Sequence, residues 1–541
     1  MTDQMPPRMP LHEFVRDAVL LDAFRRGVRA MKARKPSDPL SWFYQAAIHG
    51  VTDEMVQVQA VADPDVLLVD KGKYWNQCPH FKQESANFLP WHRGYTYYFE
   101  RILRAHTGEP RFALPYWEYA RTDYRFPREF GTHVLSTPLD GDSSNPLWYD
   151  DRNLYFASWE HPFAPDGLPY SRLTEQAVDW SVARDQSVFF GETEGTGLAG
   201  AVKDQDPRTR GRLESYPHDP IHRLTGIIVP EQVVPDPDHP GQTITRDGYA
   251  LGMSSPPTAG FDPIFCVHHS NIDRLWSEWS LMAGKSWGAF PPQSWFDERA
   301  WYFFDVVLDA DGTLRAIERN LERKRYFDSR ALGITFKYED LGKEPLRLPD
   351  PVPAPSLAWA TPASFARLIK RTEVAGASQT AVGMAPIASE VAAQFRAVQT
   401  GAVAPKRILM RINGTNLSAI AATGFDVYLT NDPNASPRRS DPSFLGSIAL
   451  FRHDHANSGA GHGGHGGHGH GVHGHHGDHE TVPASSDTFD VTRAVAASGE
   501  SDPSRLHVLI VPYSLSATTK DGADIVETRS LLFEGIEFFA G

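Results

Sequence analysis

Histidines outside one glycine-rich tract gather in two segments of the chain, at 49–92 and 218–269. Each segment contributes three candidates for metal binding, which are His49, His80, His92, His218, His222 and His269. Imidazole nitrogen is a common ligand of copper, nickel and zinc in proteins. A lone histidine beside a tryptophan is more often a satisfied core residue, so the count of three and three is what makes metal binding a candidate function.

The pair His218 and His222 carries the strongest local signal for a metal site. Residues i and i+4 share one face of a helix, and this is a common spacing of metal-binding histidines. Pro220 lies between them and must occupy the first helical turn, because proline lacks an amide hydrogen and clashes inside a helix. We therefore expect His218 at the very edge of that helix.

Two aromatic-rich segments that carry these histidines have the pattern of helices. LPWHRGYTYYFERILRAH, at 89–106, and DPIFCVHHSNIDRLWSEWSLMAG, at 262–284, each place a proline near the start, where the first turn tolerates it. Asp262 is a plausible N-cap of the second helix. Apolar residues at helical intervals within 14–31 predict a further helix. We expect residues 1 to about 340 to be mainly helical, with a helix bundle as the core.

The composition changes after this helical region. LGKEPLRLPDPVPAPSLAWATP is rich in proline, which favours an extended connector. Short runs such as KRILMRI, FDVYLT, FLGSIALF, TFDVTRAV, RLHVLIVPY and SLLFEGIEFF follow, and their β-branched content suggests a small β-sandwich. We predict a catalytic domain at 1–342, a proline-rich linker at 343–404 and a β-domain at 405–541 that contains a histidine- and glycine-rich loop at 453–479.

The overall composition limits the classes of partner and compartment. A formal net charge of −14 over 541 residues, without a clustered basic stripe, argues against nucleic acid or an anionic membrane surface as a partner. No apolar run approaches the roughly 18 residues that a membrane span requires, and no signal-peptide core is visible, so a cytoplasmic location is expected. Two cysteines, Cys78 and Cys266, exclude a disulfide framework.

Two motifs of this chain resemble the signatures of the type 3 copper family of tyrosinases, catechol oxidases and hemocyanins. They are FLPWHRGYTYYFE and DPIFCVHHSNIDRLW, in the order and separation that the family has. FDVYLT and LLFEGIEFF are similar to the C-terminal domain of plant-like polyphenol oxidases. The resemblance implies a mainly α catalytic domain, with a four-helix bundle around a dicopper site, followed by a C-terminal β-sandwich.

The resemblance also implies the cofactor and its ligands. His49, His80 and His92 would bind one copper ion, and the second ion would be bound by His218, His222 and His269. In the family's HH pair the second histidine ligates, so His268 is left as a neighbour. Neutral imidazoles suit copper, and three per ion leave open positions for dioxygen. Two metals about 3.5–4 Å apart can clamp one small oxygen ligand between them.

The first set of ligands has two special features. His80 and His92 are further apart than the matching residues of relatives, so a small insertion is expected within FKQESAN. Cys78 precedes His80 by two residues, and in fungal tyrosinases and molluscan hemocyanins such a C-x-H forms a thioether between sulfur and imidazole. The resemblance therefore implies a Cys78–His80 crosslink, with a buried free thiol as the alternative. Cys266 is expected to be structural.

Two carboxylates near His218 are candidate catalytic residues by the same resemblance. Glu214 matches a glutamate that orients a water near the second copper, and Asp219 matches a residue thought to help that water act as a base on phenols. The alternatives are a solvated surface carboxylate for Glu214 and a helix N-cap for Asp219. Pro256 stands near a position where some plant relatives have a bulky phenylalanine, which implies a wider entrance.

Asp273 lies at i+4 from His269 on the same predicted helix. A carboxylate in this place could orient a metal ligand from the second shell. It could equally form an ion pair with Arg274 or another neighbour. The sequence leaves both alternatives open.

The most histidine-rich stretch of the chain, HGGHGGHGHGVHGHHGDH at 462–479, is not expected to be the catalytic site. Glycine between the histidines leaves the backbone too free for a fixed coordination geometry. Its proposed role is auxiliary copper collection near the site, and the alternative is a solvated loop with incidental metal affinity. The histidines concerned are His462, His465, His468, His470, His473, His475, His476 and His479.

The function expected from the resemblance is that of a phenol oxidase with two copper ions. It would use dioxygen to oxidise ortho-diphenols to ortho-quinones, and hydroxylation of monophenols at the ortho position, as in tyrosinase, stays open. The alternatives are a hemocyanin-like oxygen carrier, an ortho-aminophenol oxidase, and a copper buffer based on the glycine-rich tract alone. The expected partners are a phenolic small molecule and O2, and the sequence does not determine the oligomeric state.

Overall fold

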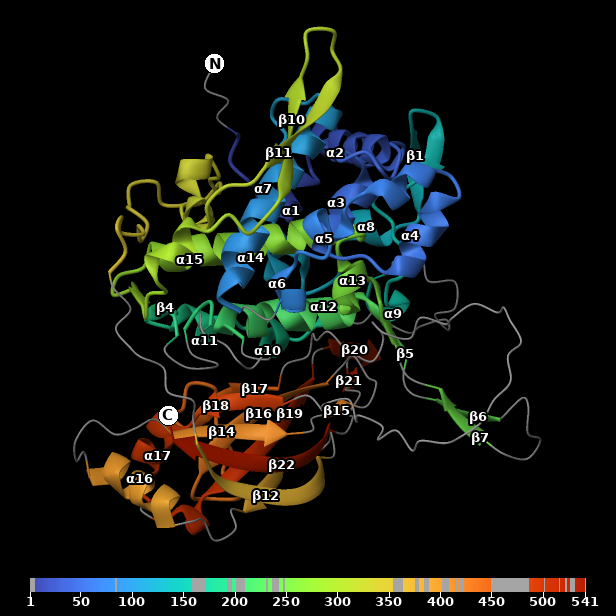
Figure 1. Cartoon of the computed structure of the whole chain (residues 1–541). Helices are drawn as coiled ribbons and strands as arrows, with labels where there is room; N and C mark the ends of the chain where they lie inside the picture. Colours follow the sequence, from blue (N-terminus) through green and yellow to red (C-terminus); the bar gives the residue numbers. More distant parts are fainter. Residues whose placement is uncertain are drawn as a thin grey trace, which may run out of the picture.

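The structure is a computed structural model in which a helical region, residues 5–353, lies against a region of strands within residues 363–540 (Figure 1). The described ranges are 5–82, 85–157, 172–191, 197–200, 210–229, 232–235, 243–246, 249–353, 363–374, 379–383, 389–400, 408–413, 416–417, 423–448, 486–500, 502–514, 516–520, 523–525 and 531–540. The histidine- and glycine-rich tract at 462–479 lies outside the described residues.

The long helices of the first region begin and end at residues that satisfy their free backbone groups. α2 (Ala18–Lys32) follows Asp17, whose carboxylate accepts hydrogen bonds from two amides of the first turn. α3 (Trp42–His49) follows Ser41, whose hydroxyl accepts from the amide of Tyr44. α7 (Phe88–Thr107) ends at Gly108, which has a left-handed φ of 64°. These three helices therefore start and stop where local chemistry favours it.

α14 (Ile264–Ser280) carries the second signature motif. The carboxylate of Asp262 accepts a hydrogen bond of 2.9 Å from the amide of Ile264, as expected of a capping residue, although Pro263 holds the N-cap position. The same carboxylate forms a buried ion pair with Arg152.

The other α-helices of this region are α1 (Leu11–Phe14), α4 (Asp53–Ala60), α5 (Lys71–Tyr74), α6 (Pro79–Lys82), α8 (Arg128–Gly131), α9 (Leu154–Ala157), α10 (Glu175–Val178), α11 (Ser181–Arg184), α12 (Asp219–Thr225), α13 (Pro256–Ala259) and α15 (Gln293–Asp297).

The helical region also contains short strands, which do not form its core. The antiparallel pairs are β1 (Val134–Leu139) with β2 (Asp142–Ser144), β5 (Ile227–Val229) with β8 (Tyr249–Leu251), β6 (Gln232–Pro235) with β7 (Thr243–Arg246), and β10 (Phe303–Leu308) with β11 (Leu314–Arg319). β4 (Val188–Phe190) and β9 (Ser286–Gly288) pair in parallel.

Large aromatic side chains from α2, α3, α7 and α14 fill the interior of the helical region, among them Phe24, Trp91, Phe99 and Phe265. No helix among the described residues has both the length and the apolar character that a bilayer span requires.

The second region contains two antiparallel sheets. The first has the order β12 (Ala363–Val374), β22 (Leu531–Ala540), β14 (Ile408–Asn413) and β18 (Ser486–Asp490), with β15 (Asn416–Leu417) also paired to β22. The second has the order β13 (Thr380–Gly383), β19 (His507–Ser514), β16 (Thr423–Thr430) and β17 (Phe444–Ser447). Alternate apolar residues of both sheets, such as Met410, Val427, Ile510 and Phe538, share one hydrophobic cluster with α16 (Ser389–Thr400) and α17 (Thr492–Ser498).

The structure differs from the predicted boundaries in two places. β12, β13 and α16 lie within the predicted linker at 343–404, because the C-terminal strand β22 pairs with β12 along most of its length. The segment TFDVTRAV does not form a single strand. Its first part ends β18 at Asp490, and α17 begins at Thr492, whose amide donates a hydrogen bond to the Asp490 carboxylate. Alternation of apolar residues was too weak in both places to show where the chain joins a sheet.

The two regions share a small sheet of their own. β20 (Ser516–Lys520) pairs with β21 (Ala523–Ile525) on one side and with β3 (Arg172–Leu173) on the other. β3 belongs to the helical region, so backbone hydrogen bonds join the two parts directly. α10 and α12 lie on the side of the helical region that faces the strands of the second region (Figure 1).

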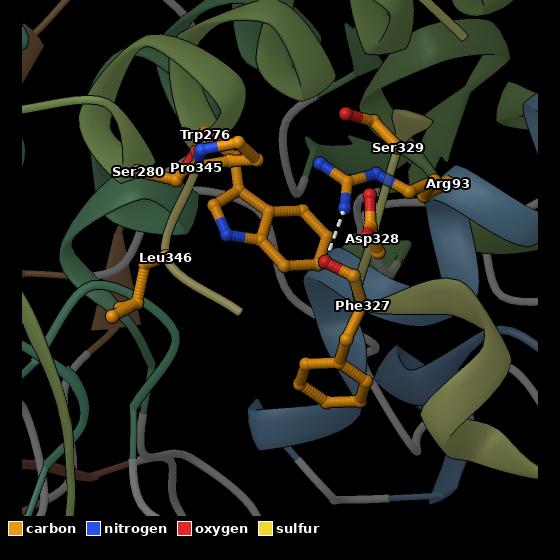
Figure 2. Close-up of a pocket in the computed structure, with 8 residues that line it drawn as sticks. All are labelled: Arg93, Trp276, Ser280, Phe327, Asp328, Ser329, Pro345 and Leu346. Atoms are coloured by element: carbon orange, nitrogen blue, oxygen red, sulfur yellow. Dashed lines mark hydrogen bonds between the residues drawn. The ribbon is translucent and has the colours of Figure 1, made fainter. Parts of the chain in front are cut away.

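A buried charge network joins the N-terminal segment, α7 and α14. Arg8 pairs with Glu100 at 2.6 Å and with Asp273 at 3.0 Å, and Asp273 also accepts a 2.6 Å hydrogen bond from Nε of Arg93. The Arg93 guanidinium lies 3.4 Å from the ring centroid of Trp276 and donates to the carbonyl of Phe327 beside a small pocket (Figure 2). Asp273 therefore balances two buried cations at once.

We predict that Asp273→Asn lowers the free energy of unfolding of the metal-free protein by about 3 kcal/mol, because breaking a buried ion pair from one side leaves the other charges uncompensated. Urea unfolding followed by tryptophan fluorescence measures this change. Asp309→Asn, which disrupts the more exposed ion pair with Arg315, is the matched control and is expected to cost less than about 1 kcal/mol. Equal effects of the two substitutions would contradict the central role of the network.

Candidate metal centre

The first predicted set of histidines converges at the ends of three helices. His49 is the last residue of α3, His80 lies in the short α6, and His92 lies near the start of α7. Cys78 immediately precedes α6 and joins them. One possible ligand atom from each of these four residues lies within 4.8 Å of the others. The structure therefore brings together the three histidines that the sequence assigned to one metal.

The second predicted set also converges, and it includes one further histidine. His218 ends η4 (Glu214–His218), a wide irregular turn, and His222 follows in α12. His268 and His269 lie side by side in α14. All four are buried, and their ligand atoms lie within 4.8 Å of one another. His268, expected only as a neighbour, also makes a 3.0 Å contact between its Nδ1 and the hydroxyl of Tyr119.

The two sets face each other in a single buried volume. The rings of His92 and His269 stack with centroids 4.2 Å apart, and those of His80 and His218 stack at 5.6 Å. Within the second set, Nε2 of His222 lies 3.2 Å from Nε2 of His269. Two metals bound by these sets would therefore be neighbours.

Hydrogen bonds from Nδ1 fix the orientation of four of these rings. A carbonyl or carboxylate oxygen can only accept, so each such contact places the imidazole hydrogen on Nδ1 and leaves the lone pair on Nε2 for a metal. The contacts are His49 with Pro256 O at 3.0 Å, His92 with Phe88 O at 2.8 Å, His222 with Met253 O at 2.7 Å, and His218 with Asp219 Oδ1 at 2.9 Å.

Burial keeps the imidazoles in their neutral, metal-binding form. Desolvation, reinforced by neighbouring histidines, holds the pKa values of His49, His92, His218 and His269 well below their usual range. Burial also lowers the pKa of His222 to about 3. Buried Nε2 of His268 and Nδ1 of His269 have no hydrogen-bond partner among the described residues. Neutral imidazoles with unsatisfied nitrogens in one volume fit a pair of copper ions.

Glu214 lies inside the site, and the alternative of a solvated surface carboxylate is wrong. Its side chain is 4% exposed, with Oε1 3.0 Å from Nε2 of His80 and 3.6 Å from Nη1 of Arg210. Burial raises the pKa of Glu214 to about 7, against the opposing effect of the Arg210 charge. Glu214 is thus placed where it can hold or accept a proton beside the metals.

Asp219 contacts a predicted ligand directly. Its Oδ1 accepts from His218, and its Oδ2 accepts a 2.6 Å hydrogen bond from Arg210. Both Arg210 and Asp219 are largely buried. The arrangement is the usual one in which a carboxylate orients a histidine from its far side, so Asp219 is suited to fixing the His218 ring. The N-cap alternative is not met, because His218 holds the N-cap position of α12 and Asp219 is the first residue of that helix.

Asp273 forms the ion pairs described above with Arg93 and Arg8 and lies 4% exposed. Arg274 pairs instead with Glu278. Of the two alternatives for Asp273, the structure favours an ion pair, but with partners far away in the sequence. Arg93 is the residue after His92, so this ion pair joins α14 to the helix that carries His92. Cys266 is buried in the helical core, as expected of a structural residue.

Several residues that shape the site were missed by the sequence reasoning. The Phe265 ring lies 4.1 Å from His269 and 4.6 Å from His49, and Phe88 lies 4.6 Å from His218 and 4.7 Å from His92. A signal existed, because each phenylalanine stands four residues before a histidine of its own helix. The carbonyls of Met253 and Pro256 could not be identified from the sequence, because every residue type has a backbone carbonyl.

Two adjacent sets of buried histidines on helices and nearby turns define a protein with a dinuclear metal centre. Residues 39–282 match the model of the common central domain of tyrosinase. The match to this model and the similarity to individual relatives support the type 3 copper family of tyrosinases and polyphenol oxidases. Members of this family are oxidoreductases that act on phenolic substrates with O2.

Individual relatives are similar over most or part of the chain. A tyrosinase of Hahella sp. (strain CCB-MM4) is 28% identical over 84% of this chain and 87% of its own length. Polyphenol oxidase A1 of Vicia faba is 29% identical over 53% of this chain and 42% of its own. The solved structure of latent apple tyrosinase aligns over 99% of this chain and 98% of its own, with 18% identity and a TM-score of 0.49.

We predict that His269→Ala lowers bound copper from two ions to about one per chain, because the second site keeps too few imidazoles. Copper analysis after gel filtration measures the stoichiometry. His268→Ala is the matched control: the resemblance makes His269, and not His268, the ligand of this pair, so two copper ions should remain. If His268→Ala alone loses copper, His268 is the ligand and His269 is the neighbour.

We predict a thioether between Cys78 and His80 in protein matured with copper. Sγ lies 3.0 Å from Nδ1 of His80 and 3.7 Å from Nε2 of His92, so both rings are within reach. Trypsin separates the alternatives, because it cuts after Lys73, Lys82 and Arg93. A link to His80 makes the peptide 74–82 lighter by two hydrogens, a link to His92 joins 74–82 to 83–93, and an alkylated Cys78 shows that neither forms.

Proposed function

We propose that the chain is a copper-dependent phenol oxidase that converts ortho-diphenols to ortho-quinones with dioxygen. The observation that carries this proposal is the meeting of two buried histidine sets, with the ring centroids of His92 and His269 4.2 Å apart. Copper bound there would supply the two-electron exchange between phenol and dioxygen. We assign one ion to His49, His80 and His92 and the other to His218, His222 and His269.

The remaining residues would shape the site for this chemistry. Phe88 and Phe265 pack against the imidazoles and exclude water from their flanks. Asp219, held by Arg210, fixes the ring of His218. Glu214 lies close enough to the metal ligands to hold a water or take the proton that a phenol must lose before it binds. This last role concerns monophenols most, since a catechol ionises more readily.

The relatives support a phenol as the substrate class without fixing which phenol. The names of the two curated relatives are those of a tyrosinase and a polyphenol oxidase. Both activities use ortho-diphenols, so oxidation of a catechol is the common expectation. Hydroxylation of monophenols and oxidation of ortho-aminophenols are separate outcomes that the substrate test distinguishes.

The proposal is tested with copper-loaded protein and a panel of a catechol, a monophenol and an ortho-aminophenol, with oxygen uptake and quinone absorbance as readouts. We expect turnover of the catechol, and in Glu214→Gln a loss of about 100-fold on any monophenol with a smaller loss on the catechol. A loaded protein that binds dioxygen reversibly and leaves the catechol unchanged would be an oxygen carrier. Equal losses in the variant would indicate a structural role for Glu214.

A further inference from the structure

The segment that supplies Glu214 and His218 has an irregular backbone at its centre. Tyr216, midway between them, has φ −147° and ψ 126°, an extended conformation inside the η4 turn. Its local backbone bonds include those from Ser215 to the Gly211 carbonyl and from Asp219 to the Glu214 carbonyl. The side chain of Tyr216 is 2% exposed, so its conformation depends on what buries it.

A cluster from the strand region buries Tyr216 and binds its hydroxyl. The hydroxyl donates to Oδ1 of Asp426 on β16 at 3.1 Å and also contacts the hydroxyl of Tyr513 on β19. Asp426 is 1% exposed and accepts hydrogen bonds of 2.8 and 3.1 Å from Nε and Nη2 of Arg439. We call Asp426, Arg439 and Tyr513, with Tyr216, the tyrosine clamp.

Arg439 connects every member of the tyrosine clamp. Its guanidinium lies 4.2 Å from the ring centroid of Tyr216 and 4.6 Å from that of Tyr513. It also donates a 2.8 Å hydrogen bond to the carbonyl of Gln176, the second residue of α10. A charge that is paired, stacked on two rings and shielded from water fixes its neighbours more strongly than a surface ion pair does.

A second contact holds the start of the same segment. Arg212, two residues before Glu214, donates to the carbonyl of Leu445 on β17. Strands β16, β17 and β19 therefore contact both ends of the stretch from Arg212 to Tyr216. His218 follows Tyr216 by only two residues, so a shift of the tyrosine ring would move the histidine.

We propose that Asp426 and Arg439 are positioning residues of the second metal site, which act through Tyr216 to hold His218 and Glu214 in place. The proposal rests on the dicopper centre of the proposed function. In this proposal the strand region helps to position the ligands of that centre, although Asp426 lies more than 200 residues after Tyr216 in the chain.

The same reasoning predicts an asymmetry between the two metals. His49 and His92 lie on α3 and α7, whose neighbours Ile48 and Trp91 belong to the core of the helical region. Those helices are positioned by their own apolar packing. The second set includes a ligand, His218, on the irregular turn that the strand region holds. In the first set, His80 contacts Glu214 of that turn at 3.0 Å, whereas His49 and His92 lie on the packed helices. Weakening the clamp should therefore loosen the second copper ion more than the first.

The test is the rate at which a chelator removes each copper ion from fully loaded, full-length protein. We expect Tyr216→Phe, Asp426→Asn and Arg439→Lys each to speed the release of one ion about tenfold, in the range found when an outer-shell partner of a metal ligand is removed. The other ion should show a clearly smaller acceleration, because His49 and His92 lie on helices packed in the core of the helical region. Asp432→Asn, at an exposed position of the loop after β16, is the matched control and should change neither rate.

A double substitution separates positioning from general stability. If Asp426 acts through the tyrosine hydroxyl, Asp426→Asn in the Tyr216→Phe background should add no further acceleration. Additive effects, equal acceleration of both ions, or unchanged release would each overturn the proposal. Should Asp426→Asn fail to fold, Tyr216→Phe alone still decides, since it removes one oxygen atom. A loaded protein that passes this test and oxidises no phenol would refute the proposed function and leave the positioning role intact.

Discussion

A set of buried imidazoles can serve a metal centre only when each ring is neutral and is turned the right way. Burial supplies the first condition by lowering the pKa values of these histidines. Hydrogen bonds from Nδ1 to fixed oxygens supply the second. His92 finds its acceptor in the first residue of its own helix, whereas His49 and His222 depend on the carbonyls of Pro256 and Met253 in a separate segment.

The approach of η5 (Gly252–Ser254) to α12 illustrates this constraint. The Met253 carbonyl meets Nδ1 of His222 only because the turn lies against the end of the helix. Gly226 follows α12 at that point, and a Cβ atom there would lie 2.1 Å from the amide nitrogen of Ser254. A glycine is therefore needed so that the backbone can come close enough to orient a histidine.

Charge and packing then hold the histidine-bearing elements against one another. Asp273 on α14 binds Arg93, the residue after His92 on α7, so a single carboxylate links the two signature helices. Arg439 links the strand region to the turn that carries His218. In both cases an arginine is the link, because its planar group can pair with a carboxylate and stack on an aromatic ring at the same time.

The sequence by itself determined the histidine sets, the helices that carry them and most strands of the second region. It could do so because helix periodicity, the position of proline and the i, i+4 spacing of His218 and His222 are local properties. The resemblance to the type 3 copper family also placed Glu214 and Asp219 near the site, by their positions relative to His218. The tertiary structure alone decided that Asp219 orients His218, that Asp273 binds Arg93 and Arg8, that residues 363–383 join the sheets, and that Asp426 holds Tyr216. Those contacts join residues distant in the chain, and neither a carbonyl acceptor nor the partner of a buried charge leaves a pattern in the amino-acid sequence.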